Sequence, residues 1–235
     1  MPHWKEEQLQ QLLSETNEQR MFDMATSLAK QLGMEYLSFV TRTHIATAQP
    51  QVRTYNNYPK AWNERYQQCN YLSIDPILAH CHTSILPILW QDEVFRETPE
   101  LWEQARLHGL RYGWSQSAHD LRQNESILSV VRNHTQVDTN EFYETAGKTI
   151  WLCNLMHTLI FDRQSTKPHS SFQLSSRETE VLKWSAAGKT AADIACILTL
   201  SQSTVNFHIR SIISKLNSSN KAGAIAIAAM NGLLG

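Results

Sequence analysis

The stretch TLSQSTVNFHIRSIISKL, residues Thr199 to Leu216, decides the fold of the C-terminal part of the chain. Ser201 is typical of a helix N-cap, and Leu200 with Val205 fits a hydrophobic staple across the helix start. The apolar residues then recur at intervals of three and four, which predicts one buried stripe. The opposite face carries polar side chains: Gln202, Ser203, Asn206 and Arg210.

Helix signals continue on both sides of this stretch. Ser175 with Glu178 and Thr190 with Asp193 each form a capping box, and Gly188 suits the end of the helix between them. A fourth helix is expected over about Asn220 to Asn231. We therefore predict an all-α unit of four helices, in which the second and third form a helix-turn-helix.

The polar face of the third helix has the chemistry of a DNA reader. Asn and Gln can bond the edge of adenine, Arg can grip guanine or a phosphate, and a helix N-terminus favours anions. A merely solvated helix face is the alternative. The predicted DNA contacts are Lys189, Ser201, Gln202, Ser203, Thr204, Asn206, Arg210 and Lys215.

Length and charge support two parts with different partners. The chain has 235 residues, 42% hydrophobic and 18% charged, which is globular composition. From Arg163 onward there are eight Lys or Arg against three Asp or Glu, a net charge of +5, whereas the preceding residues carry −6. We predict domains at 1–162 and 174–235, joined by a linker at 163–173, with the basic one meeting a polyanion.

The compartment also follows from composition. The four cysteines are far apart, with no CxxC pair, which predicts free thiols in a reducing compartment. No apolar run is long enough to span a membrane, and the N-terminus lacks the apolar core of a signal peptide. A cytoplasmic protein that meets no membrane is therefore expected.

The N-terminal part mixes helix-like and strand-like patterns irregularly, which predicts an α+β fold. Helices are expected at about Lys5–Gln31, Ala61–Cys69, Pro99–His108 and Thr139–Phe161. The strand-like runs are EYLSFVTRT, QVRTY, GWSQSAH and SILSVVRN. This irregular order lacks the β/α alternation and acidic pair of a phosphorylated receiver domain.

One segment of this part suggests a ligand pocket. Trp62 and Tyr66 share a helix face, and Asp75 lies between the apolar runs YLSI and PILA, where a buried carboxylate needs a donor. Ordinary core packing is the alternative reading of the two aromatic residues. His80, Cys81 and His82 lack the spacing of a metal site, and no nucleophile elbow is present, so neither a metal site nor an enzyme is predicted.

The C-terminal part closely resembles the LuxR-type DNA-binding domain. The residues that carry the resemblance are Glu178, Val181, Leu182, Gly188, Lys189, Thr190, Ile194, Ala195, Thr204, Val205, His208, Lys215, Leu216 and Gly232. The resemblance implies that the third helix enters the major groove and that the fourth helps to pair two subunits. Ala222, Ala226 and Ala229 would allow close helix approach, although they could equally pack inside the domain. A two-fold dimer implies an inverted-repeat operator.

Residues 1 to 162 resemble the autoinducer-binding domain of LuxR-type quorum-sensing regulators, nearest to the LasR and QscR branch. The matching positions are Trp62, Tyr66, Asp75, Pro76, Trp90 and Gly113. The implied fold is an α-β-α sandwich with an antiparallel sheet. The implied ligand is an N-acyl-homoserine lactone, with no other cofactor. Trp62 would donate to the lactone carbonyl, Asp75 would accept the amide N–H, and Tyr58 and Ser129 would donate to the amide carbonyl.

Further lining residues follow from the same resemblance. They are Tyr66, Trp90, Ser38, Phe39, Arg42, Ile77, Leu110, Gly113 and Ser115. The sequence thus predicts a quorum-sensing transcription factor that binds a lactone and, as a homodimer, double-stranded DNA, with RNA polymerase as a further partner. The alternatives are a LuxR-type regulator with a non-lactone ligand or none, an enzyme, and a protein that sequesters related regulators.

Overall fold

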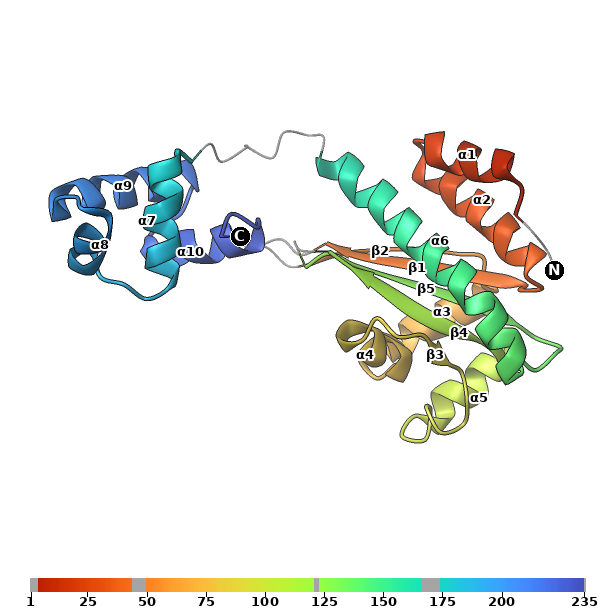
Figure 1. Cartoon of the computed structure of the whole chain (residues 1–235). Helices are drawn as coiled ribbons and strands as arrows, with labels where there is room; N and C mark the ends of the chain where they lie inside the picture. The colour runs from red at the N-terminus through yellow and green to blue at the C-terminus, as the bar shows by residue number, and fades with distance from the viewer. Residues whose placement is uncertain (1–3, 44–49, 121–122, 166–173, 235) are drawn as a thin grey trace. The chain divides into compact units, whose positions relative to one another are not determined.

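The computed structural model describes residues 4–43, 50–120, 123–165 and 174–234 of the chain (Figure 1). The chain divides into two compact units, one made mostly of residues before 164 and the other mostly of residues after it. Most of the predicted linker, 166–173, lies outside the described residues.

The first unit is built on an antiparallel sheet. Among the described residues it has five strands in the order β2-β1-β5-β4-β3. Their bounds are β1 Tyr36–Thr43, β2 Gln51–Asn56, β3 Ile88–Leu89, β4 Tyr112–His119 and β5 Glu125–Arg132. Four of them confirm the predicted strand-like runs. β3 was missed because two residues show no alternation; the strand exists through its pairing with Trp114 and Ser115.

Helices cover both faces of this sheet (Figure 1). On one face lie α1 Glu6–Ser14, α2 Glu18–Gln31 and α6 Thr139–Ser165. On the other lie α3 Lys60–Gln68, α4 Pro76–Thr83, α5 Pro99–Leu107 and a 3₁₀ turn at Tyr71–Ser73. A hydrophobic core fills each interface, one around Phe39 and Trp114 and the other around Trp62 and Trp102. The predicted α-β-α sandwich is confirmed.

The expected single helix over Lys5–Gln31 is wrong in one respect, because the chain breaks between α1 and α2. Glu15 accepts hydrogen bonds from the backbone N–H groups of Thr16 and Asn17, both at 2.8 Å, through its side chain. The side chain of Asn17 then caps α2 by accepting from the Arg20 N–H at 3.0 Å. These local bonds offer the backbone an alternative to a continuous helix.

The second unit has four helices among its described residues, as predicted: α7 Ser176–Ala186, α8 Ala191–Leu198, α9 Gln202–Lys215 and α10 Lys221–Met230. Ser175 and Thr190 form the two expected capping boxes, and Ser201 caps α9. In α10, Ala224 and Ala228 pack in the core, while Ala222, Ala226 and Ala229 are exposed. The three alanines left open by the sequence are therefore at the surface of this unit.

All four cysteines are free, as the sequence predicted. Cys69 and Cys196 are exposed, one in each unit, whereas Cys81 and Cys153 are buried. Burial raises the pKa of both the Cys81 and the Cys153 thiol to about 12. Within the described segments, no helix combines the length and the apolar character that crossing a bilayer requires.

Candidate functional site

A cavity of about 580 Å³ lies in the first unit, bounded by the sheet and by α3 and α4. Its walls combine apolar side chains with a few convergent polar groups, as small-molecule sites usually do. Of the predicted ligand-binding residues, eight line it: Ser38, Tyr58, Trp62, Tyr66, Asp75, Ile77, Trp90 and Ser129.

Strand register explains the sheet side of the cavity. Successive side chains of a strand point to opposite faces, and directly paired residues share a face. Ser38 pairs with both Asn56 of β2 and Ser129 of β5, and Val40 pairs with Thr54 and Ile127. All six of these residues line the cavity. The sheet therefore presents one polar row and one mixed row to a ligand.

Asp75 is the charged group of the cavity. It is the N-cap of α4: its Oδ1 accepts the Ile77 N–H at 2.9 Å, and its Oδ2 accepts the Tyr66 hydroxyl at 2.7 Å. Burial raises the pKa of this carboxyl, and the bonds from Tyr66 and the α4 backbone oppose that effect. Each carboxylate oxygen can accept more than one bond. A ligand N–H would therefore reduce the cost of the buried charge.

A chain of hydroxyl groups begins at Tyr58 and continues into the sheet. Side-chain hydrogen bonds join Tyr58 to Ser38 and Ser129, and burial together with Asp75 raises the pKa of the Tyr58 phenol, which stays a neutral donor. Ser129 Oγ lies 2.7 Å from Ser115 Oγ, and Ser115 accepts the Trp90 indole N–H at 2.9 Å. Burial raises the pKa of Tyr66 as well.

Aromatic rings pack around Trp62, which is itself buried. Its ring is stacked on Tyr71 with centroids 6.1 Å apart and meets Tyr66 edge-on at 5.6 Å. Trp62 belongs to the hydrophobic core and also lines the cavity, so core packing and cavity lining do not exclude each other at this position.

Five predicted ligand-binding residues do not line the cavity. Phe39 points to the other face of the sheet, into the α2 and α6 core, because it alternates with Ser38 and Val40. Leu110 is in the core beside α5, and Ser115 lies beside Ser129 on the neighbouring strand β4. Arg42 is opposite Glu125 in the sheet register, beyond the cavity rows. Gly113 lies on β4, where an added Cβ would meet the backbone of β5.

The cavity also contains residues that the sequence did not indicate. They are Val40, Val52, Thr54, Asn56, Asn63, Gln67, Asn70, Leu72, Leu78 and Ile127. Alternation could have found Val40 from Ser38, and Ile127 from Ser129. The β2 residues required the pairing of β1 with β2, which no local pattern gives.

In the second unit, α9 exposes the predicted reading face. Gln202, Ser203, Asn206 and Arg210 line one surface hollow together with Ile209. Ser201 is occupied by capping, since its Oγ accepts the Thr204 N–H at 3.0 Å. Phe207, four residues after Ser203, is also exposed, at 61%, and no sequence pattern had indicated it.

Lys215 has a different position from the other predicted DNA contacts. Its Nζ lies 2.7 Å from Glu178 Oε2, and the Glu178 side chain is only 6% exposed. Lys215 thus forms an ion pair that joins α9 to α7, and its predicted role on DNA stays a prediction. Lys189 is exposed in the turn that follows Gly188.

Comparison with known proteins places both units. A sequence model of the autoinducer binding domain matches residues 17–160, and one described as bacterial regulatory proteins, luxR family, matches residues 172–228. The chain belongs to the LuxR family. It is 35% identical over 238 residues to the transcriptional activator protein AnoR of Acinetobacter nosocomialis, which covers 100% of both chains.

Solved structures of LuxR-family proteins agree. A structure of Escherichia coli SdiA in complex with octanoyl-rac-glycerol has 32% identity and a TM-score of 0.73, covering 96% of this chain and 93% of SdiA. The N-acylhomoserine lactone dependent factor CepR2 from Burkholderia cenocepacia has 25% identity and a TM-score of 0.60, over 67% of this chain and 93% of CepR2.

This LuxR-family chain is therefore an autoinducer-binding transcription regulator with one ligand-binding and one DNA-binding unit, and not an enzyme. The nearer likeness to the LasR and QscR branch stays a prediction. Within the described residues, no group of three or more His, Cys, Asp or Glu side chains is arranged to hold a metal ion.

Proposed function

We propose that this regulator is cytoplasmic, binds an N-acyl-homoserine lactone and, as a homodimer, grips an inverted-repeat operator and contacts RNA polymerase. The domain bounds 1–162 and 174–235 are part of this proposal, with a linker at 163–173 whose first three residues continue α6. The observation that carries it is Asp75, a buried carboxylate with remaining acceptor capacity in an otherwise largely apolar cavity. A lactone offers the required combination of one amide N–H, carbonyl acceptors and an apolar tail.

In this proposal Asp75 accepts the amide N–H, while Trp62, Tyr58 and Ser129 donate to the ligand carbonyls. The remaining cavity residues enclose the ring and tail. Carbonyl acceptors suit Tyr58, because its raised pKa keeps it a donor. Burying the ligand would complete the core of the first unit and stabilise the dimer.

For the DNA, Gln202, Ser203, Asn206 and Arg210 read bases or phosphates from the surface of α9. In this proposal Lys189, Ser201 and Thr204 contact the DNA backbone. Lys215 adds a further contact while it supports α9 through Glu178. The exposed face of α10, with Ala222, Ala226 and Ala229, is the proposed pairing surface of two second units.

Removing the ligand tests the coupling. Protein purified from cells that make lactone should hold operator DNA, lose that affinity after exhaustive removal of the ligand, and regain it on addition of lactone. The measurement is a DNA-binding titration at fixed salt, because salt alone changes such affinities. Undiminished DNA affinity of the ligand-free protein would contradict the coupling.

A second candidate function has an observation in its favour. The structure of SdiA, a relative, is of its complex with octanoyl-rac-glycerol, an ester that has no amide N–H. The second candidate function is therefore that of a LuxR-family regulator whose cavity binds a non-lactone acyl compound. Solvent extraction of the purified protein, followed by mass spectrometry, separates the two by identifying the bound molecule.

Asp75→Asn should weaken lactone binding by about 1 to 3 kcal/mol, because a buried ligand N–H would lose its charged acceptor. Asn is also a good N-cap, so the start of α4 should be kept. The measurement is calorimetric titration with N-octanoyl-homoserine lactone, and octanoyl glycerol serves as the matched ligand without an N–H. Equal losses for both ligands would contradict the role given to Asp75.

A further inference from the structure

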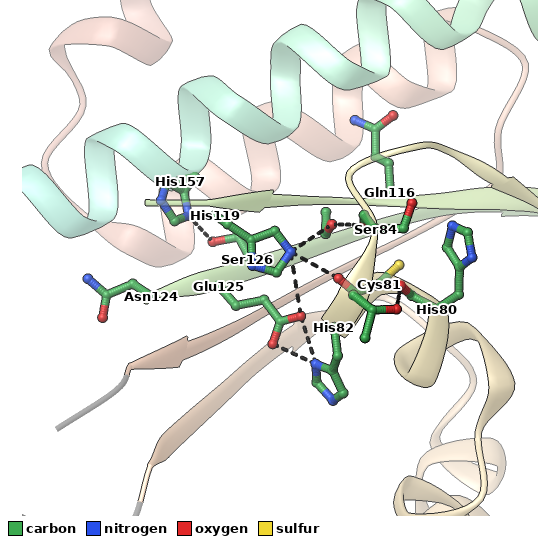
Figure 2. A network of polar contacts seen from close by, with 12 residues as sticks. His80, Cys81, His82, Ser84, Gln116, His119, Asn124, Glu125, Ser126 and His157 are labelled. Atoms are coloured by element: carbon green, nitrogen blue, oxygen red, sulfur yellow. Dashed lines mark hydrogen bonds and ion pairs between the residues drawn. The ribbon is translucent and has the colours of Figure 1, made fainter. Parts of the chain in front are cut away.

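A polar cluster lies at the C-terminal end of α4, outside the cavity (Figure 2). His82 Nδ1, in the last turn of α4, is 2.7 and 2.8 Å from the two carboxylate oxygens of Glu125. His119 Nε2 is 4.0 Å from the same carboxylate. The His82–Glu125 pair is called here the α4 bridge.

Glu125 is unusual for a carboxylate, because it is only 4% exposed. A buried charge is strongly unfavourable unless it is paired and hydrogen-bonded. Glu125 begins β5 and shares its sheet face with Ile127 and Ser129, both of which line the cavity. The bridge thus attaches α4 to the same strand that carries part of the ligand wall.

The other end of α4 is the cavity. Asp75 caps the helix, and Ile77 and Leu78 line the cavity from its first turn. His82 lies seven residues after Asp75, about 10 Å along a helix. A short helix moves as one body, so the anchor at His82 determines where Asp75 stands relative to Ser129.

Two further hydrogen bonds hold the same end of α4. His119 Nε2 lies 2.9 Å from the Cys81 carbonyl oxygen, and Ser117 donates to the Ser84 carbonyl oxygen at 2.6 Å. Both partners on the sheet belong to β4. These two contacts would remain if the bridge were broken, so loss of the bridge would loosen α4 on the sheet without detaching it.

Other charged and titratable groups surround the bridge. His119 lies on β4, and Arg42 is the β1 residue opposite Glu125 in the sheet. His80 lies two residues away on the same helix and bonds to the Leu86 carbonyl. His157, bonded to Ser126, belongs to the α6 side of the sheet.

We propose that His82 and Glu125 are positioning residues for the ligand cavity, and that their bond holds α4 on the sheet with Asp75 in reach of the ligand amide. The expected effect on ligand affinity rests on the proposed function. The expected effect on how firmly α4 is held on the sheet does not.

The test uses the full chain and measures its affinity for N-octanoyl-homoserine lactone and for octanoyl glycerol, which lacks the amide N–H that Asp75 would accept. His82→Gln and Glu125→Gln should each weaken lactone binding about threefold, as expected for a partly exposed pair, and should change the affinity for octanoyl glycerol less. The double variant should bind no worse than Glu125→Gln. The matched control is His80→Gln, on the same helix, which should keep the wild-type affinities.

Wild-type lactone affinity in both single variants would overturn the inference. A loss that is equal for the two ligands would show a structural role only, and would also overturn it. If the wild type does not bind the lactone, the proposed function fails instead. Hydrogen exchange of the α4 amides in ligand-free protein then tests whether the bridge holds α4. Exchange should be faster in His82→Gln than in His80→Gln, and equal rates would refute that role of the bridge.

Discussion

Gly113→Ala should destabilise the first unit by at least about 3 kcal/mol, enough to leave much of it unfolded at growth temperature. A Cβ at this position would lie 2.1 Å from the Val130 carbonyl oxygen and 2.9 Å from the Val131 Cα. Both are backbone atoms of β5, which is the central strand of the sheet. β4 and β5 cannot move apart without breaking the hydrogen bonds that β4 makes with β3 or that β5 makes with β1.

The measurement is thermal unfolding of the full chain followed by near-ultraviolet circular dichroism. Gly147→Ala is the matched control, because nothing lies within 4 Å of the Cβ that it would add to α6. Alanine is favoured over glycine inside a helix, so this control should be neutral or slightly stabilising. A Gly113→Ala protein that unfolds within about 1 kcal/mol of the control would contradict the steric argument.

Acid should weaken the second unit through one carboxylate. Burial would raise the pKa of Glu178, but hydrogen bonds from Lys215, Ser211 and Ser175 outweigh it and lower that pKa from 4.5 to about 2. The lengths of the first two are both 2.7 Å. Because the pKa is lowered on folding, this stabilisation is complete above about pH 4.5 and is lost as the pH falls toward 2. Its size is about 3 kcal/mol.

Glu178→Gln should therefore destabilise the second unit near neutral pH and remove this part of its acid sensitivity. Urea unfolding can be followed by the NMR signal of the Trp184 indole, the only tryptophan after residue 163. Glu180→Gln is the control, since Glu180 pairs with Arg177 at the surface. Equal urea midpoints for the two variants at neutral pH would refute the assignment.

The sequence predicted those parts of the fold whose signals are local. Ser175 with Glu178, and Thr190 with Asp193, bond across only three residues, so their spacing alone marks the starts of α7 and α8. β3 was not predictable in this way, because its two residues become a strand only by pairing with β4, more than twenty positions later.

The same distinction holds for the site. Asp75 and Tyr66 lie in one short segment, and both line the cavity as expected. Phe39 was predicted to line the cavity, but its side chain lies on the other face of β1. The family resemblance gives a position in the sequence and does not give the strand face to which the side chain points. Lys215 is bonded to Glu178, 37 residues away, and His82 is bonded to Glu125, 43 residues away. The sequence alone therefore could not distinguish Lys215 from a DNA contact, or His82 from a surface residue.

The distribution of thiols has a practical consequence. Each unit presents one accessible sulfur, at Cys69 and Cys196, while the remaining two are inside and hold their protons far above neutral pH. A maleimide donor and acceptor pair can therefore be attached to the native chain without engineering. Energy transfer between the two dyes would then follow, in single molecules, how the sensing half and the reading half rearrange as signal and operator arrive.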